Sequence, residues 1–201
     1  MQTHGLVAKT TLRYRSLTKA GKRQLPAPDL VQRQFAVAAP NQVWAADITY
    51  IPTAEGPVYL AVVMDLYNRQ VVGLAMTDRL GADLVSAALS QALARRSVRP
   101  GLIHHSDQDG LYGCAAYRDL LHQHGLVPSM SRKGNCWDNA CVESFFGLLK
   151  RELVAFHRFG RRAEAHATIF RWIAGHYNRV RRHSTLDNQS PMDYARTQTQ
   201  P

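Results

Sequence analysis

The sequence predicts an α/β fold in which a five-stranded mixed sheet is covered by helices on both faces. Two observations lead to this class. Three runs rich in apolar and β-branched residues follow one another with short turns between them. After residue 80, segments with helical periodicity alternate with strand-like runs. The chain has 201 residues, 45% of them hydrophobic, which is enough for one well-filled core.

The first three strands are expected to form an antiparallel meander. The turns between them, "TAEGP" and "NR", are too short for the crossover that parallel strands require. The second run, "VYLAVVMDLY", is nearly all apolar, which favours a central strand. We expect these strands at 42–51, 58–67 and 70–76.

The rest of the chain alternates between helices and strands. Gly125 is suited to end one helix and Asp138 to cap the start of the next. We expect helices at 81–97, 113–125, 137–154 and 163–181, and strands at 100–106 and 126–131. Three antiparallel strands followed by two parallel ones, with helices on both faces, match the ribonuclease H-like architecture.

Charge is distributed unevenly along the chain. The net charge is +10, with +6 over residues 1–40, −2 over residues 41–144 and +6 over residues 145–201. Basic ends suit a polyanion, because each neutralised phosphate releases counterions. Carboxylates concentrated in the centre of a basic protein suggest a metal held where DNA lies.

Two function classes are disfavoured. No run of 18 apolar residues is present, and the first 15 residues lack an apolar signal segment, so a membrane protein is not expected. Three cysteines without C-x-x-C spacing favour reduced thiols and disfavour zinc. We therefore expect a cytoplasmic, nucleoid-associated protein.

Three carboxylates are candidates for one site. Asp47 interrupts an apolar strand, where a charge costs several kcal/mol unless it is paired or bound to metal. Asp107 closes the fourth strand, and neighbouring strands lie about 4.8 Å apart. A helical projection places Glu143 opposite the apolar face of its helix. The alternative for each is a carboxylate that simply faces water.

Four stretches resemble the catalytic protein (OrfB type) of bacterial insertion-sequence transposases, which are relatives of retroviral integrases. They are "NQVWAADITYI", "HHSDQDGLY", "SMSRKGNCWDNACVESFFGLLKREL" and "YNRVRRHSTLDNQSP", within about residues 40–195. The resemblance implies a catalytic Asp-Asp-Glu triad with 35 residues between its last two members. That spacing selects Asp107 with Glu143 rather than Asp109, and Asp47 completes the triad.

The resemblance also implies phosphoryl transfer on DNA. The three carboxylates would hold Mg²⁺ or Mn²⁺, as two ions, with Asp47 shared between them. Water would cut at the end of the element, and the freed 3′-OH would attack another phosphodiester. The expected partners are double-stranded DNA, at element ends and target, and further copies of the chain on paired ends.

Several cations are candidate DNA contacts. Lys150 lies seven residues after Glu143, an offset at which related integrases touch the DNA end. The full set is Lys150, Arg132, Lys133, Arg179, Arg181 and Arg182. The alternative for each is a solvated surface cation.

Aromatic side chains near the carboxylates carry two further expectations. At least one of His104 and His105 is expected beside the carboxylates or the DNA, because hard cations prefer oxygen ligands. Trp44 and Trp137 are expected to pack in the interior.

The chain departs from the family pattern at two places. Where the family reads H-S-D-R-G-S-Q-Y, this chain reads "HSDQDGLY", with Gln108, Asp109 and Leu111 as the differences. The extra carboxylate of Asp109 could compete for metal or repel phosphate. We also expect that the family's N-terminal helical region is cut short in this chain, which predicts strongly salt-dependent DNA binding with poor recognition of specific ends.

These observations predict three parts: a basic arm over 1–39 that is a remnant of a helical DNA-binding region, an integrase-like core over 40–160, and a C-terminal helix with a basic tail over 161–201 that completes the core. Two other functions stay open. One is a truncated, catalytically weak DNA-binding remnant that modulates the full-length transposase. The other is a hydrolase of RNA–DNA hybrids.

Overall fold

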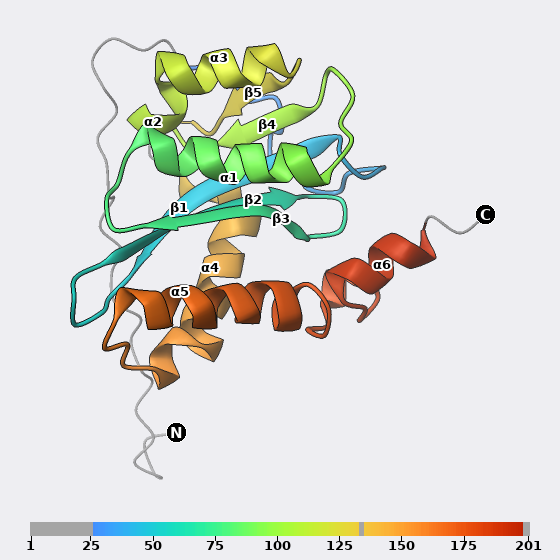
Figure 1. Cartoon of the computed structure of the whole chain (residues 1–201). Helices are drawn as coiled ribbons and strands as arrows, with labels where there is room; N and C mark the ends of the chain where they lie inside the picture. The colour runs from blue at the N-terminus through green and yellow to red at the C-terminus, as the bar shows by residue number, and fades with distance from the viewer. Residues whose placement is uncertain (1–25, 133–134, 199–201) are drawn as a thin grey trace, which may run out of the picture.

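A computed structural model describes residues 26–132 and 135–198. Its centre is a five-stranded sheet in the order β3-β2-β1-β4-β5, with helices on both faces (Figure 1). The strands are β1 (Val43–Ile51), β2 (Val58–Asp65), β3 (Val71–Thr77), β4 (Ile103–Ser106) and β5 (Val127–Met130). The pairs β1–β2 and β2–β3 are antiparallel, whereas β1–β4 and β4–β5 are parallel. The predicted ribonuclease H-like topology is confirmed.

Two apolar layers hold the helices to the sheet. On one face, α1 (Ala82–Arg95) and α3 (Ala115–Gln123) cover Trp44, and on the other, α4 (Ala140–Glu152) and α5 (Arg162–Arg171) cover Leu60 (Figure 1). Helix α1 lies so close to β3 that a Cβ on Gly73 would come within 2.2 Å of the Ala88 carbonyl oxygen. A glycine is therefore required at this contact.

The helix expected at 113–125 corresponds to α3, and a short helix before it was not predicted. A short helix, α2 (Gly110–Gly113), precedes α3, and Cys114 between them has extended backbone angles. The end at Gly125 is confirmed, because this residue has φ +66 and its N–H donates to the His122 carbonyl oxygen.

The helix expected at 137–154 begins differently. A 3₁₀ turn (Cys136–Asn139) leads into α4, and a second 3₁₀ turn (Val154–Phe156) follows it. The prediction that Asp138 caps this helix is wrong. Its carboxylate accepts hydrogen bonds from two arginines that the chain brings from other segments, Arg33 and Arg132. Charged donors outcompete a backbone N–H for a carboxylate.

The last predicted helix also changes character. After α5 the chain continues as a π-helical turn (Trp172–Tyr177), and the following Asn178 pairs its side-chain amide with both the N–H and the C=O of Val71. A further 3₁₀ turn (Ser184–Leu186) and a helix, α6 (Pro191–Thr197), were not predicted. Ser190 caps α6 by accepting from the Asp193 N–H.

The two tryptophans differ in environment. Trp44 is fully buried, as predicted, and its indole N–H donates to Asn41 Oδ1. Trp137 is 69% exposed, so the prediction that it packs in the interior is wrong. It stands on the 3₁₀ turn before α4, which directs its ring away from the core. No helix within the described ranges is long and apolar enough to cross a bilayer.

Candidate active site

The pleat of β1 determines which face Asp47 occupies. Trp44 and Ala46 belong to the apolar layer under α1 and α3, whereas Ala45 and Ile51 belong to the layer under α4 and α5. Side chains two residues apart share a face. Asp47 therefore lies on the face that α4 covers.

The register between β1 and β4 brings Asp107 near Asp47. Ala45 pairs with His105 in this parallel ladder, an offset of 60 residues. The ladder ends at this pair. Asp47 lies two residues further along, in the middle of β1, and Asp107 directly follows the carboxyl end of β4, the kind of edge where open α/β sheets bind their ligands.

Glu143 comes from the first turn of α4. The predicted helical faces are confirmed there, because Val142 and Phe145 are buried while Glu143 is exposed. Asn139 has a different environment. It lies on the Glu143 side of the helix but is buried, and its side-chain N–H donates to the Ala46 carbonyl oxygen at 3.1 Å. This bond joins the start of α4 to the residue before Asp47.

The three carboxylates influence each other's protonation. Burial raises the pKa of Asp47 well above its usual range, and the nearby charges of Asp107, Glu143 and Asp109 raise it further. Burial also raises the pKa of Asp107 to about 6, followed by the charge of Asp109. Burial raises the pKa of Glu143. Asp47 and Asp107 both keep part of their surface accessible to solvent.

The carboxylates are neighbours electrostatically, but they are not arranged as a coordination shell. Over the part of the chain that the structure describes, no three His, Cys, Asp or Glu side chains form a group that could hold a metal ion as they stand. Asp47 instead accepts a hydrogen bond from the Ile48 N–H at 2.7 Å.

The two histidines have separate roles. The ring of His105 is bonded through Nδ1 to Ser129 Oγ at 2.9 Å and through Nε2 to the Asp138 carbonyl oxygen at 3.0 Å. His104 faces the opposite layer, where its Nε2 meets the Tyr117 hydroxyl at 3.0 Å. Burial lowers the pKa of both imidazoles, that of His104 to about 3. As the sequence suggested, His105 supports the carboxylate region, and it does so by joining β4 to the start of α4.

Asp109, the departure from the family pattern, has a structural role. Its carboxylate caps α2 by accepting from the Leu111 N–H at 3.1 Å, and its own N–H donates to Asp107 Oδ1 at 3.2 Å. The side chain is buried. Its charge still raises the pKa of Asp47 and Asp107.

Three of the predicted DNA-contacting cations have protein partners. The Lys150 Nζ lies 5.8 Å from the centre of the Tyr50 ring, and burial lowers its pKa to about 8. Arg132 is bonded to Asp138, yet its side chain is 60% exposed. Arg181 forms a two-pronged ion pair with Glu152, with N···O distances of 2.7–3.0 Å.

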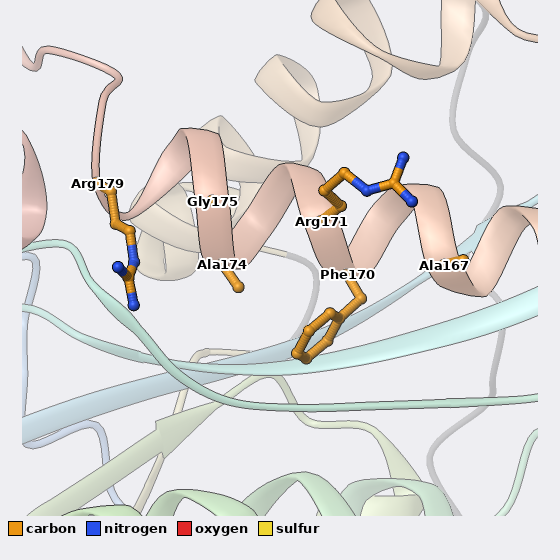
Figure 2. Close-up of a pocket in the computed structure, with 6 residues that line it drawn as sticks. All are labelled: Ala167, Phe170, Arg171, Ala174, Gly175 and Arg179. Carbon is orange, nitrogen blue, oxygen red and sulfur yellow. The ribbon is translucent and has the colours of Figure 1, made fainter.

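Arg179 and Arg182 are also described by the structure. Arg179 borders a shallow hollow of about 520 Å³ on α5 and the π-helical turn, where it lies on the same side of the helix as the Phe170 ring (Figure 2). The side chain of Arg182 is exposed. Lys133 lies outside the described residues.

Sequence reasoning missed Arg33 and the true role of Asp138. The signal for Asp138 was its place beside Asn139 before an apolar helix, which indicates a cap. Nothing local to Asp138 points to Arg33, which is 105 residues away.

The fold is that of a retroviral integrase core. The chain of a simian T-cell lymphotropic virus intasome superposes with a TM-score of 0.66 at 14% identity, over 91% of this chain and 62% of that one. The HTLV-2 integrase catalytic core domain, solved in complex with magnesium, gives 0.56 at 14% identity, over 78% and 97%. Two family models described as "Integrase core domain" match residues 37–136 and 124–191.

Sequence relatives narrow this class. The transposase for insertion sequence element IS904 of Lactococcus lactis is 44% identical over 195 residues, which cover 96% of this chain and 77% of that protein. Transposase InsF for insertion sequence IS3A of Escherichia coli is 42% identical over 194 residues, covering 96% and 67%. The chain belongs to the insertion-sequence transposase family. It is an integrase-type catalytic core, and therefore a DNA-processing enzyme of the DDE type.

Proposed function

We propose that Asp47, Asp107 and Glu143 are the catalytic carboxylates of this transposase and that they hold two divalent cations, Mg²⁺ or Mn²⁺. The observation that carries the proposal is that Asp107 and Glu143 lie near enough to Asp47 for their charges to raise its pKa, while the start of α4 is hydrogen-bonded to the residue before Asp47. Crowded carboxylates that repel each other are the electrostatic situation that an adjacent cation relieves.

The donor set fits a hard cation. All three side chains offer oxygen, which Mg²⁺ and Mn²⁺ prefer, and the related HTLV-2 integrase core was solved with magnesium. Asp47 lies on β1, and Asp107 directly follows the neighbouring strand β4. Glu143 is exposed and has a long side chain, so rotation about its own bonds is the movement that would bring its carboxylate to the other two.

The reaction we propose is cleavage at the end of the insertion sequence followed by joining of the freed 3′-OH to target DNA. The bound cations would stabilise the entering and leaving oxygens of an in-line displacement. Asp47 and Asp107, fixed by the sheet, would define the position of the scissile phosphate, and Glu143 would complete the site from α4. No protein side chain is required as a nucleophile.

The cations are proposed to hold the DNA backbone. Lys150 stands two helical turns beyond Glu143 on α4, and Arg132 precedes the same helix. Lys133, Arg179, Arg181 and Arg182 extend the proposed set. Integrase structures in dimeric and intasome forms suggest that this chain also works as an assembly on paired DNA ends.

Strand cleavage of a labelled duplex carrying the element's own end, with Mn²⁺ or Mg²⁺, tests the proposal. Asp47→Asn, Asp107→Asn and Glu143→Gln should each abolish nicking, while Asp119→Asn, an exposed residue on α3, should not. Thermal unfolding of each variant would show that it is folded. An active Asp107→Asn enzyme would refute the assignment.

The same assay separates the alternative functions. Absence of cleavage in the wild-type chain with either metal would favour a DNA-binding remnant, and preference for an RNA–DNA hybrid would favour a hydrolase.

A further inference from the structure

A buried carboxylate lies five residues before Glu143 and is held from outside by two arginines. The Asp138 side chain is 0% exposed. Arg132 donates to it through Nε at 2.9 Å, through Nη2 at 3.0 Å and through its backbone N–H at 3.1 Å. Arg33 donates through Nε at 2.8 Å. These bonds lower the pKa of Asp138 far below its usual range, so it stays ionised.

The backbone of residues 138–139 contacts the strands that carry the other two carboxylates. The Asp138 carbonyl oxygen is bonded to His105, two residues before Asp107. The Asn139 side chain donates to the carbonyl oxygen of Ala46, the residue before Asp47. The segment that begins α4 is therefore the mechanical link between Glu143 and both aspartates.

Arg33 reaches this link from a segment that precedes the first strand. Residues 28–31 cross β5, where the Leu30 N–H donates to Ser129 Oγ at 2.9 Å and the Pro28 carbonyl oxygen accepts from Met130. The side chain of Val31, the last residue of this segment, is buried. Arg33 itself has φ +63, a left-handed conformation that a non-glycine residue rarely adopts. Such a conformation persists only where the surroundings favour it.

We infer that Arg33 is a positioning residue of the active site: acting through Asp138, it holds the start of α4 so that Glu143 faces Asp47 and Asp107. The inference rests on the proposed role of Glu143. It also gives the segment before the core a function beyond tethering, because the state of that segment is transmitted to the catalytic helix. Arg132 acts on the same carboxylate from the loop after β5.

Substitution of Arg33 in the whole chain tests the inference. Arg33→Gln removes the charge, Arg33→Lys keeps it without the planar guanidinium, and Arg118→Gln, an exposed arginine on α3, is the matched control. Hydrogen exchange of the amides of residues 138–143 reports local order without requiring activity. Arg33→Gln should speed exchange there, Arg33→Lys should restore part of the protection, and Arg118→Gln should match wild type.

Two further measurements separate positioning from DNA contact. Mn²⁺ binding by titration calorimetry should weaken about tenfold in Arg33→Gln, the scale typical for groups that support metal ligands. The single-turnover cleavage rate should fall, while the DNA dissociation constant and its salt dependence stay unchanged. A direct phosphate contact would instead lower the salt slope by about 1 and leave exchange and Mn²⁺ binding intact.

These measurements distinguish failure of the role inferred for Arg33 from failure of the proposed catalytic function. Wild-type chain that binds Mn²⁺ and cleaves DNA, together with Arg33→Gln that matches it in exchange, metal affinity and rate, would overturn the inference and leave the proposed function standing. Wild-type chain that neither binds Mn²⁺ nor cleaves would remove the proposed function itself. Asp138→Asn, which keeps the side-chain shape but removes the charge and one of the two acceptor oxygens, should reproduce the Arg33→Gln exchange pattern if both act through one ion pair.

Discussion

Asp47 lies two residues beyond Ala45, and Asp107 lies two residues beyond His105, the residue that pairs with Ala45 in the parallel β1–β4 ladder. Two carboxylates so placed repel each other when both are ionised. Burial, followed by the charges of Asp109 and Glu143, raises the pKa of Asp107 to about 6, and the charge of Asp107 in turn raises the pKa of Asp47. The proposed cation site is in this way a local source of instability in the fold.

We predict that Asp107→Asn stabilises the chain at pH 7 in the presence of EDTA. The folded-state pKa of about 6 lies above the ordinary value of 3.8, so the folded state binds the proton more tightly than the unfolded state. Below pH 3.8 the residue is protonated in both states and the destabilisation is absent. It grows as pH rises and is complete above pH 6, where it is on the order of 1–3 kcal/mol.

Thermal unfolding at pH 4 and pH 7 measures this effect. The gain in midpoint from Asp107→Asn should appear at pH 7 and be nearly lost at pH 4, and Asp119→Asn should show neither. Added Mn²⁺ should stabilise wild type and narrow the difference between the two proteins. A lower midpoint for Asp107→Asn at pH 7 would mean that the carboxylate is not under repulsion.

The extra carboxylate of Asp109 allows its capping role and its charge to be separated. Asp109→Asn and Asp109→Ala both remove the charge, but only asparagine keeps an oxygen for the Leu111 N–H. We expect the alanine variant to be less stable than the asparagine variant by about 0.5–2 kcal/mol. In both, the pKa of Asp107, followed by carboxyl NMR, should fall from about 6. Equal stability of the two variants would argue against the cap.

Local patterns are enough to predict the sheet and the exposed face of α4. The strands follow from runs of apolar residues, and the exposure of Glu143 follows from helical periodicity. These signals lie within a few residues of the feature that they predict. The choice of Asp107 over Asp109 depends instead on the resemblance to transposases and on the spacing to Glu143, and the triad itself stays a prediction.

The failures share one physical cause, which is contact between segments far apart in the chain. The sequence around Asp138 predicts a helix cap, because Arg33, which binds its carboxylate, is 105 residues away in the chain. The π-helical turn arises where Asn178 is drawn to the backbone of Val71, 107 residues away. The missed α6 is the exception, because Ser190 and Pro191 are a local start signal. The three-part division of the chain remains a prediction.

A pair of buried tyrosines predicts opposite effects from the same substitution. The Tyr117 hydroxyl is bonded to His104 Nε2, whereas the Tyr112 hydroxyl has no hydrogen-bond partner among the described residues. Tyr117→Phe leaves a buried nitrogen unpaired and should cost about 1–3 kcal/mol. Tyr112→Phe removes an unsatisfied group and should change the free energy of unfolding by less than about 0.5 kcal/mol, or stabilise.

Urea denaturation of the two variants measures the difference. The rings lie 5.4 Å apart in the same layer, so each variant is the other's control for loss of a hydroxyl in this environment. The slope of the free energy against urea should be unchanged in both. A loss in Tyr112→Phe as large as in Tyr117→Phe would show that the Tyr112 hydroxyl has a partner in solution.

Lys150 should make DNA binding depend on pH between pH 7 and pH 9, a range in which an ordinary lysine stays protonated. Burial against Tyr50 lowers its pKa to about 8, so its ammonium group loses the proton between pH 7 and pH 9. If this group contacts a phosphate, wild-type affinity for duplex DNA should fall over that interval. Lys150→Arg, which stays charged, should lose this dependence, and Lys150→Gln should lower the slope of log affinity against log salt by about 1.

Arg151→Gln, one residue along the same helix and exposed, is the matched control for net charge and should keep the pH dependence. Because phosphate favours the charged amine, the fall should be centred above pH 8 in the complex. An affinity that is flat from pH 7 to pH 9 in wild type, and that responds equally to Lys150→Gln and Arg151→Gln, would reduce Lys150 to a general contributor of positive charge.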